Sequence, residues 1–68
     1  MSNLIFLVEE APEGGYTARA LGESIFTEAD TLDGLQEQVR DAVRCHFDEH
    51  ERPSIVHLHL VRDLVIAV

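Results

Sequence analysis

Four histidines are the side chains best suited to chemistry, because an imidazole can ligate a metal ion or exchange a proton near neutral pH. His46 and His50 stand four residues apart in a predicted helix, and His57 and His59 stand two apart on one face of a predicted strand. Either spacing could aim two rings at one metal ion. Neither pair has an acidic or cysteine ligand at a fixed spacing, so we interpret all four as polar surface residues and predict no metal site and no cofactor.

Cys45 and the acidic clusters are the other candidates for chemistry. Neighbouring residues on a helix point about 100° apart, so Cys45 and His46 are not expected to form a thiolate–imidazole pair. We expect Cys45 to pack beside the core as a small hydrophobic residue. Paired carboxylates act as acid and base only within a cleft, so Glu9, Glu10 and the run FDEHE are expected to be solvated. The chain is therefore predicted not to be an enzyme, and catalysis by the histidines ranks last among its possible functions.

The segment 28–47, EADTLDGLQEQVRDAVRCHF, predicts the single helix of the chain. Thr31 is a favourable N-cap residue. Apolar residues then recur at steps of three and four, which indicates a stripe facing a core. The stripe consists of Leu32, Leu35, Val39, Val43 and either His46 or Phe47. The opposite arc is polar, and its acidic residues Glu37 and Asp41 are our candidates for contact with a partner protein.

Short apolar or alternating segments on both sides of the helix predict strands. Gly14 and Gly15, which accept positive φ, are expected to turn the chain between the first two strands. Residues 62–63 either form a tight turn into a fifth strand over 64–68 or a bulge within one long strand, and we favour the turn. The strands that we expect lie at residues 4–10, 16–21, 25–29 and 54–61.

These elements predict one α+β domain over residues 1–68. It is an antiparallel sheet of four to five strands with one helix packed on one face, in the order β-β-β-α-β(-β). The first and last strands carry apolar side chains on both faces, whereas one helix covers only one face. A chain of 68 residues also buries only about 60% of its unfolded surface, and association is a common remedy. We therefore expect a homo-oligomer, a dimer or higher, in which a second chain covers the other face.

Charge and composition narrow the class of partner. Asp and Glu number 13 against 5 Lys and Arg, which gives a formal net charge of -8. Such a chain repels phosphate, so we expect no direct binding to nucleic acid, whereas a basic protein is a favoured partner. No apolar stretch is long enough to span a membrane. The single cysteine forms no internal disulfide, which suits a reducing cytoplasm.

The order of motifs resembles the N-terminal domain of the HicB family, antitoxins that pair with small HicA RNA-cleaving toxins. An apolar strand, an acidic turn ending in GGY and the segment FTEADTL before an amphipathic helix carry the resemblance, which covers residues 4–47. The resemblance implies a sheet of three antiparallel strands plus a later one, one helix against it and self-association. Its most specific residues are Gly14, Gly15, Tyr16, Thr27, Glu28, Asp30, Thr31 and Leu32.

Two features depart from the pattern of that family. The link between the second and third strands is the short LGES in place of a longer segment containing proline, and the sequence stops at Val68 without a DNA-binding part. The predicted function is a non-catalytic interaction module, resembling a HicB antitoxin, that binds and neutralises a small basic HicA-like ribonuclease toxin. The alternative is an orphan homo-oligomeric structural or ligand-binding protein of the same fold with no toxin partner.

Overall fold

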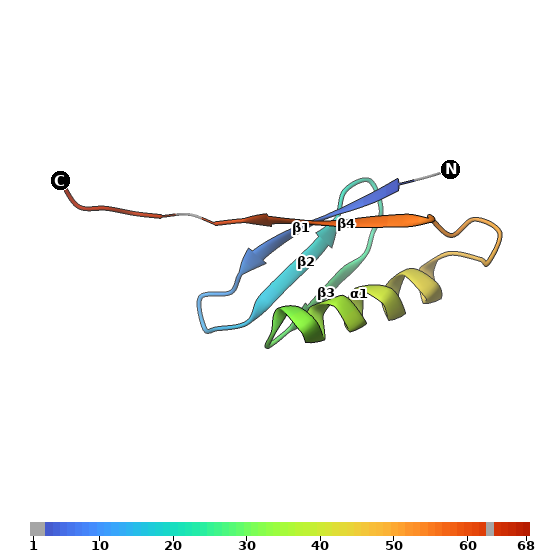
Figure 1. Cartoon of the computed structure of the whole chain (residues 1–68), viewed down its shortest axis with the longest axis horizontal. Coiled ribbons are helices and arrows are strands. Elements are labelled where there is room, and N and C mark those ends of the chain that lie inside the picture. The colour runs from blue at the N-terminus through green and yellow to red at the C-terminus, as the bar shows by residue number, and fades with distance from the viewer. Residues whose placement is uncertain (1–2, 63) are drawn as a thin grey trace.

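Four strands form one sheet and a single helix lies against it in the computed structural model, which describes residues 3–62 and 64–68 (Figure 1). The predicted α+β class and the order β-β-β-α-β are confirmed. The elements are β1 (Asn3–Glu10), β2 (Tyr16–Ala20), β3 (Phe26–Ala29), α1 (Leu32–His46) and β4 (Ile55–Val61).

The sheet has the strand order β3-β2-β1-β4, and it is mixed rather than antiparallel throughout as predicted. β1, β2 and β3 form an antiparallel meander, whereas β4 pairs with β1 in parallel. The reason is the crossover: the 15 residues of α1 carry the chain back along the sheet, so β4 runs in the same direction as β3 and hence as β1. Parallel strands require such a crossover, which is usually helical.

The turn between β1 and β2 depends on its glycines, as predicted. Gly14 and Gly15 have φ of 104° and 84°. The turn is closed by hydrogen bonds from the Gly14 N–H to the Ala11 carbonyl and from the Ala11 N–H to the Gly15 carbonyl, both 3.0 Å. A Cβ at Gly15 would lie only 2.8 Å from the carbonyl oxygen of Ala29. Only glycine fits both this backbone conformation and the close approach of β3.

Helix α1 begins after the predicted cap. The Thr31 hydroxyl oxygen accepts a hydrogen bond of 3.0 Å from the Gly34 N–H. The helix ends at His46 because Phe47 adopts an extended conformation, with φ −109° and ψ 141°. The placement of His50 on the helix was therefore wrong, since it lies beyond this end. Phe47, not His46, completes the apolar stripe by packing against the core.

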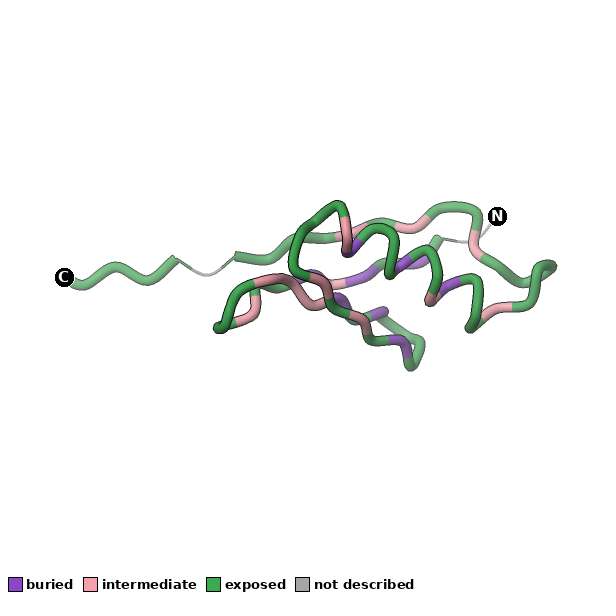
Figure 2. The backbone as a smooth tube through the Cα atoms, turned by 90° about the horizontal axis from the view of Figure 1, so that it is seen from below, coloured by how far each residue is buried: buried purple, intermediate pink, exposed green. Residues whose placement is uncertain are grey.

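The core lies between α1 and one face of the sheet, and Figure 2 shows the buried parts of both elements turned toward each other. The buried side chains are Leu4, Phe6, Val8, Ala18, Ala20, Ile25, Leu35, Val39 and Val43. Leu32, at the first position of the helix, is 39% exposed. Cys45 is exposed, which contradicts its predicted place beside the core. It lies two residues, or about 200°, around the helix from Val43.

The end of the chain continues past the sheet. β4 ends at Val61, and residues 64–68, which we call the C-terminal arm, lead away from the body as an extended segment that belongs to no strand (Figure 1). The predicted turn at 62–63 includes Asp63, which lies outside the described residues. The molecule is accordingly elongated, with extents of 52 × 21 × 18 Å. Within the described ranges no helix has the length and apolar character needed to cross a membrane.

Candidate interaction surfaces

The outer face of α1 carries the two acidic residues that the sequence suggested for partner contact. Glu37 and Asp41 are exposed, and each lies beside an arginine three residues further along the helix. The Arg40 Nη1 atom is 2.7 Å from Glu37 Oε1, and the Arg44 Nη1 atom is 3.7 Å from Asp41 Oδ1. The negative charge of both candidates is thus compensated locally, although exposed ion pairs of this kind are weak enough for a partner to displace.

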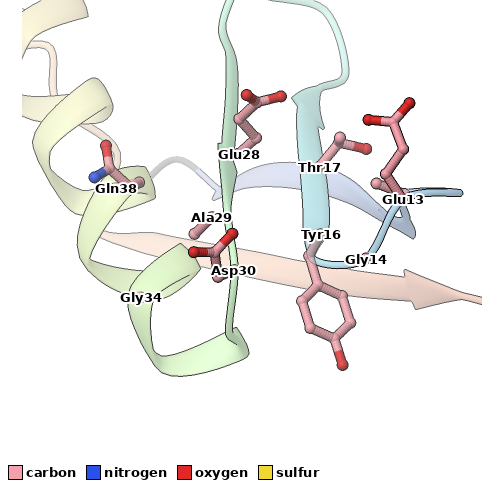
Figure 3. A pocket seen from close by; sticks show the side chains of 10 residues that line it. Glu13, Gly14, Tyr16, Thr17, Glu28, Ala29, Asp30, Gly34 and Gln38 are labelled. Atoms are coloured by element: carbon pink, nitrogen blue, oxygen red, sulfur yellow. The ribbon is translucent and has the colours of Figure 1, made fainter.

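A second acidic surface lies beside the β1–β2 turn, at the end of the sheet opposite to the β2–β3 loop. A hollow of about 610 Å³ is formed where the β1–β2 turn, β3 and the start of α1 meet (Figure 3). We call it the acidic hollow because Glu13, Glu28 and Asp30 are among the residues that line it, together with Tyr16 and Thr17. It lies where the two faces of the sheet meet, because Thr17 and Glu28 belong to the open side and Tyr16 to the helix side. Within residues 3–62 and 64–68 none of these three carboxylates forms an ion pair.

The chemistry of the acidic hollow is that of a receptor for a cation. A carboxylate forms charge-assisted hydrogen bonds with a guanidinium or ammonium group. Tyr16 also lines the hollow, but in Figure 3 its ring points to the opposite side of the sheet from Glu13 and Glu28. A basic side chain of a partner would meet three uncompensated charges here, in contrast to the paired charges on α1.

Sequence reasoning did not join Glu13 to Glu28 and Asp30. The latter two stood among the residues of the family resemblance, but only as part of the approach to the helix. The Gly14–Gly15 turn and the pairing of Thr17 with Glu28 bring the three acids together across 17 positions of sequence. No local spacing signals this arrangement, because it depends on strand register.

The sheet face away from α1 has no cover within the described structure, and we call it the open face. Strand register aligns Phe26, Arg19, Leu7 and His59 in one row across all four strands. Phe26 is 63% exposed. Arg19 forms no ion pair or side-chain hydrogen bond with any described residue. The open face thus combines apolar side chains with an unpaired cation. Its residues are Asn3, Ile5, Leu7, Glu9, Thr17, Arg19, Phe26, Glu28, Ile55, His57, His59 and Val61.

The four histidines do not converge. His57 and His59 are exposed on the open face, and His50 lies in the loop after α1. His46 Nε2 is 3.0 Å from Glu23 Oε1, a contact that joins the β2–β3 loop to the end of the helix. Among the described residues there is no group of three or more His, Cys, Asp or Glu side chains arranged to hold a metal ion.

An exposed ion pair lies at the base of the C-terminal arm. Arg62 places Nε 3.0 Å and Nη2 2.7 Å from Glu10 Oε1. The hydrogen bond to this carboxylate, and then its charge, raise the pKa of Arg62. Because Glu9 pairs with Val61, the Glu10–Arg62 contact continues the register of β1 and β4 by one residue.

Comparison with known proteins identifies two similar proteins, both named UPF0150 protein. The one from Archaeoglobus fulgidus is 60% identical over 55 residues, which cover 81% of this chain and 82% of that protein. The one from Thermotoga maritima is 45% identical over 65 residues, which cover 96% of this chain and 91% of that protein. No protein-family model matches, and no solved structure gives a significant match. Since these identities extend over most of both chains, the chain belongs to the UPF0150 family.

Proposed function

We propose that this chain is a non-catalytic interaction module that binds and neutralises a small basic ribonuclease of the HicA kind. The resemblance to HicB antitoxins supports a toxin as the class of partner. The negative net charge of the chain supports a partner whose surface is positively charged. A protein that cleaves RNA must itself attract phosphate, so its surface is basic. An acidic chain of this size can occupy that surface.

The acidic hollow is the observation that carries the proposal. Three of the five arginines lie in ion pairs with acids of the same chain, namely Arg40, Arg44 and Arg62. Glu13, Glu28 and Asp30 have no such partner among the described residues and gather in one concave site. Lysine or arginine side chains that bind RNA in the toxin would enter this hollow, so that binding would directly block the surface that RNA needs.

The first experiment identifies the partner by its activity. The full chain is used to isolate associated proteins from its native cell, and any small basic protein recovered is tested for RNA cleavage with and without the chain. We expect cleavage that stops when the two proteins are present in equal amounts. Recovery of no basic protein, or of one that does not cleave RNA, would contradict the proposal.

A matched pair of double variants then locates the contact. Glu28→Gln with Asp30→Asn removes two of the three negative charges of the acidic hollow, and Glu37→Gln with Asp41→Asn removes two from the outer face of α1. We expect the first to accelerate dissociation from the toxin about tenfold or more, since docked charges act mainly on dissociation. Equal effects of the two variants would mean that the hollow is not the docking site.

The alternative function is a homo-oligomeric structural or ligand-binding protein with no toxin partner. The open face favours it, because apolar side chains such as Ile5 and Ile55, 42% and 43% exposed, lie there without a covering element in the described structure. A protein that self-associates and leaves the RNA cleavage of every associated protein unchanged would support this alternative over the antitoxin.

A further inference from the structure

We propose that the C-terminal arm adds as an antiparallel strand to the outer edge of β4 in a second copy of the chain, and that the second copy returns the same contact. Each protomer thereby supplies the fifth strand of the other's sheet. The sequence predicts a fifth strand within one chain. In this arrangement the fifth strand of each sheet comes from the other chain. This inference goes beyond the proposed function and applies equally to its alternative.

The residues of the arm are apolar, like those of a buried strand, yet they are highly exposed to solvent. Leu64, Val65 and Ile66 are 85%, 91% and 73% exposed. The arm leads straight away from the body (Figure 1), so most of this apolar surface is left uncovered by its own chain. The radius of gyration is 13.3 Å, whereas a compact chain of this length has about 11 Å. Burial of the arm, favourable by about 25 cal/mol per Å² of apolar surface, requires another molecule.

The outer edge of β4 offers the complementary surface. β4 is the last strand in the sheet order, so the backbone groups of Ile55–Val61 that point away from β1 have no strand beside them in the described structure. Natural edge strands are commonly protected by lysine, proline or a bulge. The sequence IVHLHLV contains neither lysine nor proline. All seven residues pair with β1 in an uninterrupted parallel register, so the strand has no bulge.

A groove on the helix side of β4 indicates where the side chains of an added strand would lie. Because α1 packs mainly over β3 and β2, a groove of about 270 Å³ remains between the helix and β4. Val39, Val56 and Leu58 form its apolar lining, with Gln36 and Arg40 at the rim. A strand placed beyond β4 would present its own side chains to this groove and extend the core sideways.

The alternation of side chains matches the arm to this position. Val56 and Leu58 face the helix side, so the same alternation carried along an extended chain sets Leu64 and Ile66 on that side. Residues directly opposite each other in an antiparallel pair share a face. A two-fold axis through Val61 places Leu64 opposite Leu58 of the partner subunit and Ile66 opposite Val56 of the partner subunit. Large apolar residues then meet along the whole contact.

Two other pairings are less favourable. A two-fold axis through Arg62 would set two guanidinium groups opposite each other, and like charges in that position destabilise a sheet. A hairpin within one chain would pair residue 64 with residue 61 and turn Leu64 to the open face. The arm does not fold back in this way, because it continues the direction of β4 (Figure 1).

A designed disulfide tests the register directly. In a Cys45→Ser background, Leu58→Cys and Leu64→Cys lie six residues apart on an extended chain, about 20 Å, and a disulfide needs Cα atoms within about 7 Å. Only the exchanged pairing brings them together, so we expect a covalent dimer after mild oxidation, seen by electrophoresis without reductant. In the control, Leu21→Cys replaces Leu58→Cys. Equal yields of dimer from the two variants would overturn the proposal.

Sedimentation of two charge variants tests whether the arm or the open face forms the dimer contact. Ile66→Asp changes an exposed arm residue and leaves the monomer core intact, so we expect a monomer with an unchanged circular dichroism spectrum. Phe26→Asp, the matched control on the open face, should remain dimeric. The inference is overturned if Ile66→Asp stays dimeric, if Phe26→Asp alone dissociates, or if the unmodified chain is a monomer throughout the micromolar range.

Discussion

The two faces of the sheet are built from the same strands, yet only one of them is packed. On the helix side Phe6 is fully buried, whereas its neighbour Ile5 on the open face is 42% exposed. Alternation along β1 makes this contrast, since successive side chains of a strand point to opposite faces. The difference indicates that stability of the single chain resides in the helix-covered face. The open face and the arm carry apolar surface that contributes little to it and is available for association.

The largest effect on stability is expected when a charge is placed on the covered face, and a second variant places the same charge on the open face for comparison. Val39→Asp puts an unpaired carboxylate where the side chain is 4% exposed, so we expect a loss of several kcal/mol, comparable to the whole stability of a small domain. Phe26→Asp, at a position that is 63% exposed, should change the free energy of unfolding by less than about 1 kcal/mol. Urea denaturation followed by circular dichroism measures both. Similar losses would mean that the open face is part of the core.

The sequence predicted the covered side well because its signals are local. The spacing of Leu35, Val39 and Val43, the cap at Thr31 and the glycines of the first turn each determine structure within a few residues, and the structure confirms all of them. Cys45 was misplaced because a small thiol fits the surface as easily as the core, and only its angle from Val43 on the helix decides between them.

The direction of β4 and the acidic hollow could not be predicted in the same way. Whether β4 joins the sheet in parallel depends on where a helix crossover returns the chain, and no residue of IVHLHLV encodes that choice. The hollow needs the register between β2 and β3 to bring Glu13 near Glu28. Both features depend on contacts between distant parts of the chain, for which a single sequence gives no direct signal.

A smaller effect is expected at the turn that sets the hairpin against β3. At Gly15 a Cβ would meet the Ala29 carbonyl oxygen at 2.8 Å, whereas at Gly14 there is open space, although φ is positive at both. Gly14→Ala should therefore cost only the backbone strain, about 1 kcal/mol. Gly15→Ala adds the steric clash and should cost about 2–3 kcal/mol. Thermal and urea unfolding measure the stability of both variants. Equal losses of unfolding free energy would show that β3 moves away from the added Cβ without loss of stability.

The cap of α1 should contribute less again. Thr31→Ala removes the hydrogen bond from the Gly34 N–H, and we expect a loss of about 1 kcal/mol. Thr31→Ser keeps the acceptor oxygen and should retain most of the stability. The midpoint of urea unfolding measures both variants, and an unchanged midpoint in Thr31→Ala would mean that water replaces the cap.

The smallest effect on stability is expected on the outer face of α1, where Glu37→Lys with Asp41→Lys reverses two exposed charges. Both changes break ion pairs with Arg40 and Arg44, but exposed pairs contribute little, so the loss should stay below about 1 kcal/mol.

The same double variant has a larger effect on the rate of association with a basic partner. Long-range attraction guides diffusional encounter, so reversing the two charges should slow association about tenfold at low salt and weaken its salt dependence. The dissociation rate should stay unchanged if the partner docks at the acidic hollow, as we propose, rather than on the helix. Stopped-flow measurements over a range of salt concentrations separate the two rates. If dissociation accelerates instead, Glu37 and Asp41 contact the partner directly, and the helix rather than the hollow is its docking surface.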